Sequence, residues 1–170
     1  MIDCCLVFKP EPGSRVDRRI EQLSKTRPGN SINHTDSGSL CRHPIGLSVE
    51  VKSREGDALE AEVQMGTWHA AQWRSMRRHA PDGAAIEFLP GIIISGHEWY
   101  FVATLPPEHS PDPFTGGTSK PTLYSRMHLG STSDEQGVCK IVASLRCLVD
   151  WLEREYWPAF QEEVLGLPPG

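Results

Sequence analysis

Residues 45–52 read IGLSVEVK, and this stretch decides the fold. Every second position from Ile45 to Val51 is apolar, and small or polar residues stand between, which is the two-residue period of a β-strand with one buried face. Glu50 and Lys52 share the opposite face, because side chains on a strand repeat every second residue. The stretch therefore predicts a strand that packs on one side and carries a carboxylate beside an ammonium on the other.

The segments before and after this strand predict its first two neighbours. Residues 2–8 also alternate and predict a first strand. A helix is predicted from Asp57 to about residue 79, because Asp57 and Glu60 have the spacing of a capping box, in which the first side chain and the fourth bond each other's backbone.

The rest of the chain completes a mixed pattern. Residues 91–95 and 99–105 predict a hairpin around Gly96-His97-Glu98, and residues 122–127 predict another strand. Further helices are predicted over residues 16–23, from Ser133 (with Gln136 in a second capping box) to Trp157-Pro158, and over residues 159–165. The proline-rich stretch Pro106–Pro121 predicts a flexible surface loop. We expect one α/β (α+β) domain over residues 1–170, with a mixed central sheet flanked by helices.

Composition narrows the possible partners. The 170 residues suit one domain, and 17 Lys and Arg against 22 Asp and Glu give a net charge of −5. This acidic balance argues against a generic nucleic-acid coat, although a local basic groove stays compatible with it. Since the sequence has neither a run of 18 apolar residues nor the order of a secretory signal, we expect an intracellular protein, cytoplasmic or nuclear, with no membrane partner.

The five cysteines do not follow a disulfide framework. Cys41-Arg42-His43 offers two zinc ligands, but no Cys-x-x-Cys or His-x-x-x-His pair completes a tetrahedral set. We therefore predict buried, reduced thiols rather than a structural zinc site.

Four polar residues on consecutive predicted elements form a candidate site. Asp3 lies on the first strand, Glu50 and Lys52 on the second, and Gln64 on the helix that follows. Two carboxylates on adjacent strands suit Mg²⁺ or Mn²⁺, which lowers the pKa of a bound water, while a neighbouring lysine orients that water or neutralises developing charge. The alternative reading is a solvated cross-strand charge pair, which is the commoner meaning of Glu-x-Lys alone.

These residues carry a resemblance to a known superfamily. The order Ile2-Asp3, then residues 48–52 (SVEVK), then residues 64–71 (QMGTWHAA) resembles the PD-(D/E)XK nucleases in their RecB-like form, with Trp68 in the aromatic place of the helix motif. More specifically, the chain resembles the fungal PD-(D/E)XK nuclease-like domain proteins. The blocks that match this group are residues 31–36 (SINHTD), 89–91 (LPG), 96–101 (GHEWYF) and 156–158 (YWP).

The resemblance implies a restriction-endonuclease-like core of the αβββαβ type. It also implies Asp3 and Glu50 as metal ligands if metal binding is retained, Lys52 as the catalytic lysine and Gln64 as a cleft residue. Members of the superfamily usually begin with a helix that supplies a further glutamate. This sequence starts inside the first strand, so we expect an N-terminally shortened domain that lacks the first helix.

A missing helix has two expected consequences. One side of the sheet would be uncovered, exposing Ile45, Leu47, Val49 and Val51, and a homodimer would then cover it. The metal would also keep fewer protein oxygens, which weakens the case for phosphodiester hydrolysis.

Other side chains are candidates for chemistry or binding. His34 and His97 are candidate general acids or bases beside Asp36 and Glu98, or they hold loop geometry by hydrogen bonds. Trp68 and Trp99 are candidates for lining an apolar substrate pocket, or they belong to the core. The three arginines of the first long helix are either a phosphate-contacting stripe or a solvated helix end: Arg74, Arg77 and Arg78.

Three functional classes follow. The acidic charge, the missing helix and the aromatic content favour an enzyme of fungal secondary metabolism that uses no cofactor. We expect this enzyme to act on an apolar small molecule by acid/base-assisted cyclisation or isomerisation, with Glu50, Lys52, Gln64, His34 and His97 as the catalytic set. The second class is a Mg²⁺-dependent nuclease or phosphodiesterase at the same cleft, although nucleic acid is disfavoured as a partner. The third is a non-catalytic interaction module.

Overall fold

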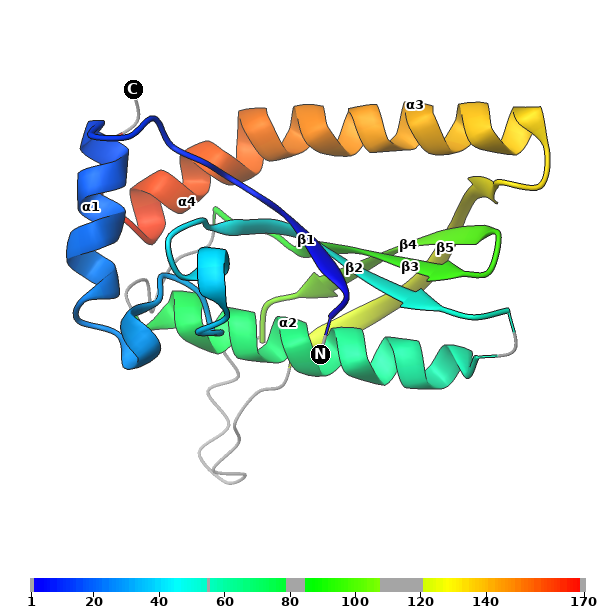
Figure 1. Ribbon diagram of the computed structural model, residues 1–170, viewed down its shortest axis with the longest axis horizontal. Helices are drawn as coiled ribbons and strands as arrows, with labels where there is room; N and C mark the ends of the chain where they lie inside the picture. Colours follow the sequence, from blue (N-terminus) through cyan, green and yellow to red (C-terminus); the bar gives the residue numbers. More distant parts are fainter. Residues whose placement is uncertain (1, 55, 79–84, 108–120, 169–170) are drawn as a thin grey trace.

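The computed structural model describes residues 2–54, 56–78, 85–107 and 121–168. Its five strands form one sheet in the order β1-β2-β3-β4-β5 (Figure 1). The strands are β1 (Cys4–Val7), β2 (Ile45–Lys52), β3 (Leu89–Ser95), β4 (Glu98–Leu105) and β5 (Thr122–Ser131). The α-helices are α1 (Arg15–Ser24), α2 (Ala58–Arg77), α3 (Glu135–Trp151) and α4 (Trp157–Glu163), with 3-10 turns η1 (Pro28–Asn30) and η2 (Gly38–Cys41) between α1 and β2.

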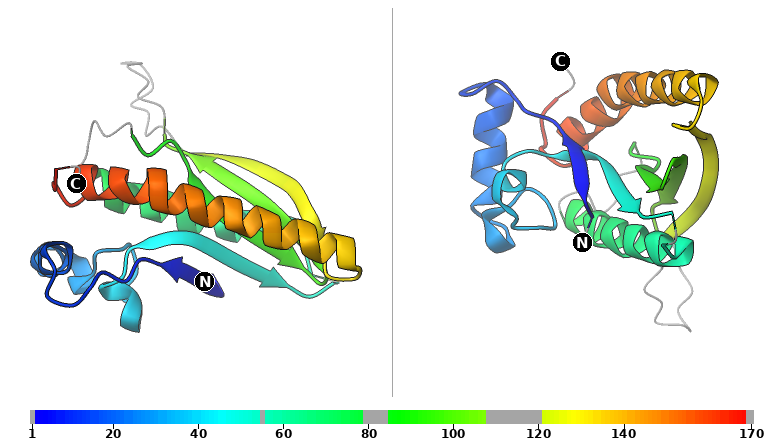
Figure 2. Two further views of the ribbon diagram at one scale, coloured as in Figure 1. Left: turned by 90° about the horizontal axis from the view of Figure 1, so that it is seen from above. Right: turned by 45° about the vertical axis from the view of Figure 1, so that its right-hand side comes forward.

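The sheet is mixed, as predicted. β2 and β3 are parallel and are joined through α2, whereas β1 pairs with β2, β3 with β4, and β4 with β5 in antiparallel fashion. Figure 2 shows β1 and β5 at the two ends of the sheet. Because β1 is antiparallel to β2, the beginning of the chain lies beside the end of β2, where Glu50 and Lys52 are found.

Helices cover both faces of the sheet. In Figure 1, α2 lies below the sheet and α3 lies above it. A smaller core cluster, which includes Ala61, Met65, Ile93 and Val102, joins α2 to the sheet. The larger cluster joins β2 and β3 to α1, to the end of α2 and to the C-terminal helical segments. The mixed α/β fold class expected from the sequence is thus confirmed.

The apolar face of β2 is covered, contrary to expectation. Ile45 and Leu47 are each 1% exposed, and Val49 is 9% exposed. Leu47 and Val49 share a buried cluster with residues of α4 and of the turn before it, which lie more than 100 residues later in the chain. Only Val51 is exposed as expected. Because this face is covered within one chain, it gives no reason to expect a homodimer, and the homodimer stays a prediction.

Both long helices, α2 and α3, begin at a capping aspartate, and one of the two caps lies one residue after the predicted position. Asp57 is the N-cap of α2, and its carboxylate accepts from Leu59 N–H. At α3 the cap is Asp134, not the predicted Ser133, and it accepts from Gly137 N–H at 2.7 Å. An aspartate carboxylate is the stronger acceptor for the positive end of the helix, which explains the difference.

The predicted long C-terminal helix is interrupted. α3 ends at Trp151 and is followed by a π-helical turn, η3 (Leu152–Tyr156), before α4 begins. Pro158 has no N–H to donate to the carbonyl of the preceding turn, which is a physical reason for a change of helical geometry here. α4 includes much of the separately predicted closing helix.

Gly91 on β3 allows α2 to approach the sheet closely. A Cβ atom at this position would lie 2.9 Å from Met65 Sδ and 2.9 Å from a methyl group of Val102. A side chain at this position would have to displace the buried end of Met65, which packs α2 on the sheet.

Three other expectations can be compared with the structure. The five cysteines are free, as predicted, but Cys4, Cys139 and Cys147 are exposed rather than buried. Of the predicted loop Pro106–Pro121, residues 108–120 lie outside the described part of the chain. No described helix is both long and apolar enough to cross a membrane.

Candidate active site

Glu50 and Lys52 form a shielded ion pair at the end of β2. Lys52 Nζ lies 3.0 Å from Glu50 Oε1, and the two side chains are 17% and 3% exposed. Both project from the polar face of β2, because two residues separate them on a strand. The hydrogen bond to Glu50, ahead of the attraction of Glu50, Glu60 and Asp3, raises the pKa of Lys52, so the amine is held as an ammonium.

Two residues of α2 complete the surroundings of this ammonium. Lys52 Nζ donates to Gln64 Oε1 at 2.9 Å and lies 3.7 Å from Glu60 Oε1. The amide nitrogen of Gln64 donates to the same Glu60 oxygen at 3.2 Å. Glu60 and Gln64 are four residues apart and therefore neighbours on the helix surface. Lys52 is thus held from both the strand and the helix.

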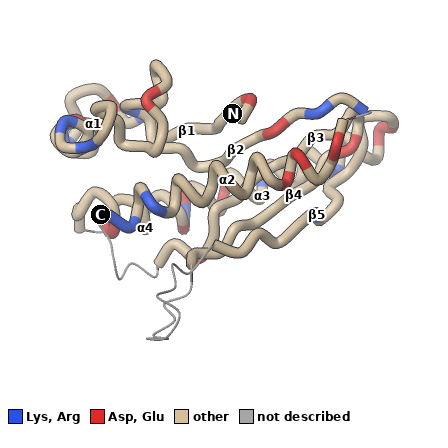
Figure 3. Tube along the Cα trace, turned by 90° about the horizontal axis from the view of Figure 1, so that it is seen from below, with Lys and Arg blue, Asp and Glu red and all other residues tan. Residues whose placement is uncertain are grey.

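Asp3 joins the site from the edge of the sheet. Its Oδ2 accepts from the backbone N–H of Val51 at 2.7 Å, between the two charged residues of β2. Asp3 is also close enough to contribute to the raised pKa of Lys52. The charged positions near the N-terminus and at the end of β2 can be followed in Figure 3. The structure therefore brings together the four residues that the sequence placed at one site.

The carboxylates of Asp3 and Glu50 are the groups of this site that could hold a divalent cation. No described residue donates to Glu50 Oε2, although this oxygen is buried. Asp3 retains one carboxylate oxygen beyond the one that bonds Val51. No group of three or more His, Cys, Asp or Glu suited to a metal occurs among residues 2–54, 56–78, 85–107 and 121–168. Two carboxylates with water as the remaining ligands fit Mg²⁺, which usually keeps several waters in proteins.

His34 and Trp68 lie next along the same face of the sheet. Trp68 Nε1 donates to Ser48 Oγ at 3.0 Å, and Ser48 precedes Glu50 on the same side of β2. The ring of His34 meets the ring of Trp68 edge-on, with centroids 4.2 Å apart. Burial, and secondarily Arg74, lowers the pKa of His34 to about 4. His34 is therefore neutral at pH 7, and neither ring nitrogen has a partner within the described residues.

His97 lies on the turn between β3 and β4, and Glu98 is the first residue of β4. His97 is exposed, and its Nδ1 lies 2.9 Å from Thr132 Oγ1. Glu98 Oε2 lies 2.7 Å from His128 Nε2. The turn reaches the end of β2, where Gly96 N–H donates to Lys52 O at 3.0 Å. Nevertheless, the contacts of both side chains are with β5 and the turn after it, and not with the Lys52 network.

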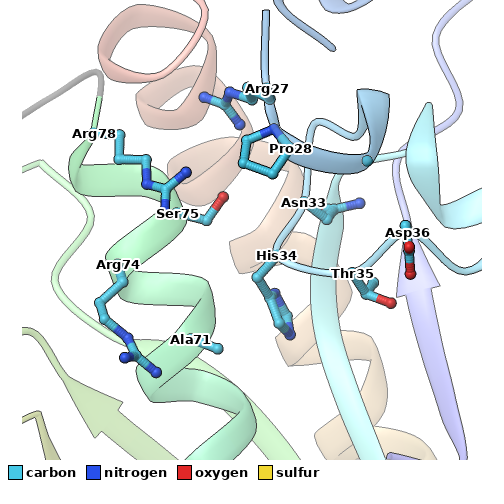
Figure 4. Close-up of a pocket in the computed structure, with 11 residues that line it drawn as sticks. Arg27, Pro28, Asn33, His34, Thr35, Asp36, Ala71, Arg74, Ser75 and Arg78 are labelled. Carbon is cyan, nitrogen blue, oxygen red and sulfur yellow. The ribbon is translucent and has the colours of Figure 1, made fainter. Parts of the chain in front are cut away.

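The remaining candidates lie apart from the ion pair. Trp99 packs against the larger core cluster and does not line a described pocket, which fits the reading of this residue as core. Asp36 lines a pocket of about 400 Å³ together with His34 (Figure 4). Trp68 is thus the predicted substrate-binding aromatic that stands closest to the site.

Sequence reasoning missed two residues that the structure singles out. Glu60 was assigned to a capping box, but its carboxylate bonds Gln64 and approaches Lys52. Glu60 and Gln64 are four residues apart, and this spacing is the feature of the sequence that indicates a contact between them on the helix surface. Arg27 carries no local signal, yet it is 7% exposed and lines the pocket with His34.

Comparison with known families agrees with this geometry. The family model described as PD-(D/E)XK nuclease superfamily matches residues 1–157. The chain belongs to the PD-(D/E)XK nuclease superfamily. Comparisons with curated proteins and with solved structures gave no match. Membership confirms the resemblance at the level of the superfamily, whereas the fungal group and the N-terminal shortening stay predictions. Nucleases of this superfamily usually use Mg²⁺.

Proposed function

We propose that this protein is a divalent-metal-dependent phosphodiesterase of the nuclease type, acting at Asp3, Glu50, Lys52 and Gln64. The observation that carries the proposal is the state of Glu50. Its carboxylate is buried, one oxygen is paired with Lys52, and the other has no partner among the described residues. A buried acceptor without a partner costs free energy, and a bound cation would remove that cost.

The roles of the side chains follow from their contacts. Asp3 and Glu50 would hold Mg²⁺ or Mn²⁺, which supplies Lewis-acid polarisation and a water of lowered pKa when bound. Lys52 remains an ammonium and donates to the attacking water or to a charged phosphoryl oxygen. Gln64 accepts from Lys52 and so fixes the direction of the other ammonium protons.

Small-molecule cyclisation or isomerisation is the less supported alternative. That reading needs His34 and His97 beside one substrate. His34 packs on Trp68 near the middle of α2, whereas His97 is exposed and lies within hydrogen-bond distance of Thr132, directly after β5. The proposed acid/base set therefore lacks a shared cavity within the described residues, since the pocket at His34 is lined by neither Lys52 nor His97.

Cleavage of plasmid and single-stranded DNA and RNA by the purified chain tests the proposal. We expect cleavage with Mg²⁺ or Mn²⁺ and none with EDTA. Glu50→Gln and Lys52→Ala should each lower the rate by about 100- to 1000-fold, because each removes a charge that acts on the reacting group. In parallel, Mg²⁺ should raise the melting temperature of the wild type but not of Glu50→Gln.

Lys25→Ala is the matched control. Lys25 also forms an ion pair of 3.0 Å, with Glu21, but this pair is exposed on α1. The control should cleave at the wild-type rate. Absence of divalent-dependent cleavage of all these substrates, or full activity in Lys52→Ala, would overturn the proposal.

A further inference from the structure

The polar cavity that His34 and Asp36 line lies between α2 and the segment that links α1 to β2. Its volume is about 400 Å³, within the usual range of small-molecule sites. Three of its lining residues are arginines: Arg27 before η1, Arg74 on α2 and Arg78 after α2. Figure 4 shows these three guanidinium groups on one side of the pocket and Asp36 on the other.

Arg27 is a buried cation without a counter-charge in the described structure. The residue is 7% exposed, and one guanidinium nitrogen donates to the backbone oxygen of Ile32. Its Nε and its second terminal nitrogen have no partner among the described residues. Buried guanidinium groups are normally paired with carboxylates or other anions, because an unpaired charge is costly to remove from water.

Neighbouring positive charges increase that cost. Burial, and secondarily Arg78, lowers the pKa of Arg27 to about 10, so Arg27 remains charged at pH 7. None of the ion pairs formed by residues 2–54, 56–78, 85–107 and 121–168 includes Arg27, Arg74 or Arg78. The pocket thus collects three like charges, and the one carboxylate among its lining residues is that of the exposed Asp36.

The remaining lining residues do not supply the missing charge. Asp36 is exposed and stands across the pocket from the guanidinium groups. The amide of Asn33 is used inside the fold, where it donates to the backbone oxygens of Leu40 and His43. Ser75 and Thr35 add hydroxyl groups to the wall.

We propose that Arg27, Arg74 and Arg78 form a binding pocket for a terminal phosphate group. One Arg27 nitrogen donates to the backbone oxygen of Ile32 and Arg74 Nε donates to that of Ala70, and the remaining N–H groups lie in fixed planes. Such donors match the three acceptor oxygens of a phosphate monoester better than the two of a carboxylate. The volume leaves room for part of the molecule that carries the phosphate.

The position of the pocket relates it to the candidate active site. Arg74 follows Gln64 by ten residues on α2, which is about 15 Å along the helix at a rise of about 1.5 Å per residue. His34 lines the pocket and packs on Trp68, which bonds to β2 two residues before Glu50. We infer that the phosphate belongs to the end of the chain that is cleaved at Lys52. This last step rests on the proposed function, whereas phosphate binding itself does not.

Titration calorimetry with inorganic phosphate, in EDTA and at constant ionic strength, tests the pocket. We expect saturable binding to the wild type. Arg74→Gln and Arg78→Gln each remove a charged hydrogen-bonding partner and should raise the Kd by about tenfold or more. Both residues are exposed, and circular dichroism checks that the variants remain folded.

Arg146→Gln is the charge-matched control. Arg146 is an exposed arginine of α3, on the other side of the sheet from α2 (Figure 1). This variant should bind phosphate as the wild type does. Absence of saturable binding, or an unchanged Kd in both pocket variants, would overturn the proposal.

Two oligonucleotides distinguish the source of the phosphate. Binding in EDTA that is at least tenfold tighter for a 5′-phosphorylated strand than for its 5′-hydroxyl counterpart, and is lost in Arg74→Gln, assigns a nucleic-acid end. Equal binding of the two strands, with inorganic phosphate still bound, overturns the link to the cleaved chain and leaves a small phosphate ester as the ligand. Lys52→Ala should lose cleavage but keep phosphate binding, so the two proposals fail independently.

Discussion

The charged side chains at the two ends of α2 differ in how they are paired. Near its beginning, the cation Lys52 lies between the carboxylates of Glu50 and Glu60 and the amide of Gln64. Near its end, Arg27, Arg74 and Arg78 line a pocket and form none of the ion pairs of the described residues. The first cluster is nearly complete and lacks a partner at one carboxylate oxygen, whereas the second lacks a whole anion.

The two clusters represent two kinds of buried charge, one that is paired and one that is unpaired. A paired charge supports the fold as long as both partners remain, and removing one partner is costly. An unpaired charge weakens the fold in the absence of ligand, and its presence is then better explained by binding. The predictions below test whether the two ends of α2 differ in this sense.

Lys52→Met should have the largest effect on stability. The Glu50 carboxylate, which is 2% exposed, would stay buried without its cation, and a buried charge that loses its partner is strongly destabilising. Urea unfolding at pH 7 measures the free energy. The double variant Glu50→Gln/Lys52→Met should recover most of the loss, since no charge is then left unpaired. A double variant that is no more stable than Lys52→Met would contradict the pairing.

Acid should destabilise the fold through two neutral histidines, His69, which is fully buried on α2, and His34, which packs on Trp68 of the same helix. Burial lowers the pKa of His34 to about 4 and that of His69 to about 3, from 6.5. Below about pH 6.5 the unfolded chain takes up these protons and the folded chain does not, so the free energy of unfolding falls as the pH drops towards 4. Each histidine contributes about 1.4 kcal/mol per pH unit.

His34→Gln isolates one of the two contributions. Between pH 7 and pH 5, the loss of stability in this variant should be smaller than in the wild type by about 2 kcal/mol. Urea unfolding at several pH values measures the difference. A profile identical to the wild type would show that His34 already carries its proton in the folded protein.

Arg27→Met should have the smallest effect, and in the opposite direction. Arg27→Met removes an unpaired buried charge together with the hydrogen bond to the backbone oxygen of Ile32. We expect the removal of the charge to outweigh the lost bond, so that the free energy of unfolding rises by about 1 kcal/mol while phosphate binding is lost. Arg19→Met is the matched control, because Arg19 Nε donates to Leu165 O at 2.6 Å. The control should lose about 1 kcal/mol. A loss of stability in Arg27→Met would indicate that Arg27 supports the fold instead.

The sequence predicted the part of the site that local periodicity determines. The period of β2 places Glu50 and Lys52 on one face, and chain order brings Asp3 and Gln64 to them. Glu60 was assigned wrongly because an acidic residue three positions after Asp57 fits a cap and a surface network equally well. Spacing along the sequence cannot distinguish a helix cap from a surface network, since the network with Lys52 depends on the end of β2 lying beside α2.

Long-range packing explains the other errors. The apolar face of β2 was predicted to be open, but distant residues around α4 cover Leu47 and Val49. Similarly, Arg27 stands in a polar stretch without periodicity, and only the approach of α2 to η1 buries it. Neither contact leaves a pattern within a short window of sequence.

Asp3 reaches the site from a strand that is held on one side only. β1 has four residues, pairs with β2 alone, and changes register between Leu6 and Val7. Short edge strands separate from their sheets at a lower free energy than the whole domain unfolds. Fraying of β1 would break the bond from Val51 to Asp3 while the rest of the sheet stays intact. The proposed metal site would then be complete only in the fraction of molecules in which this edge is closed, and amide hydrogen exchange along β1 should slow when Mg²⁺ is added.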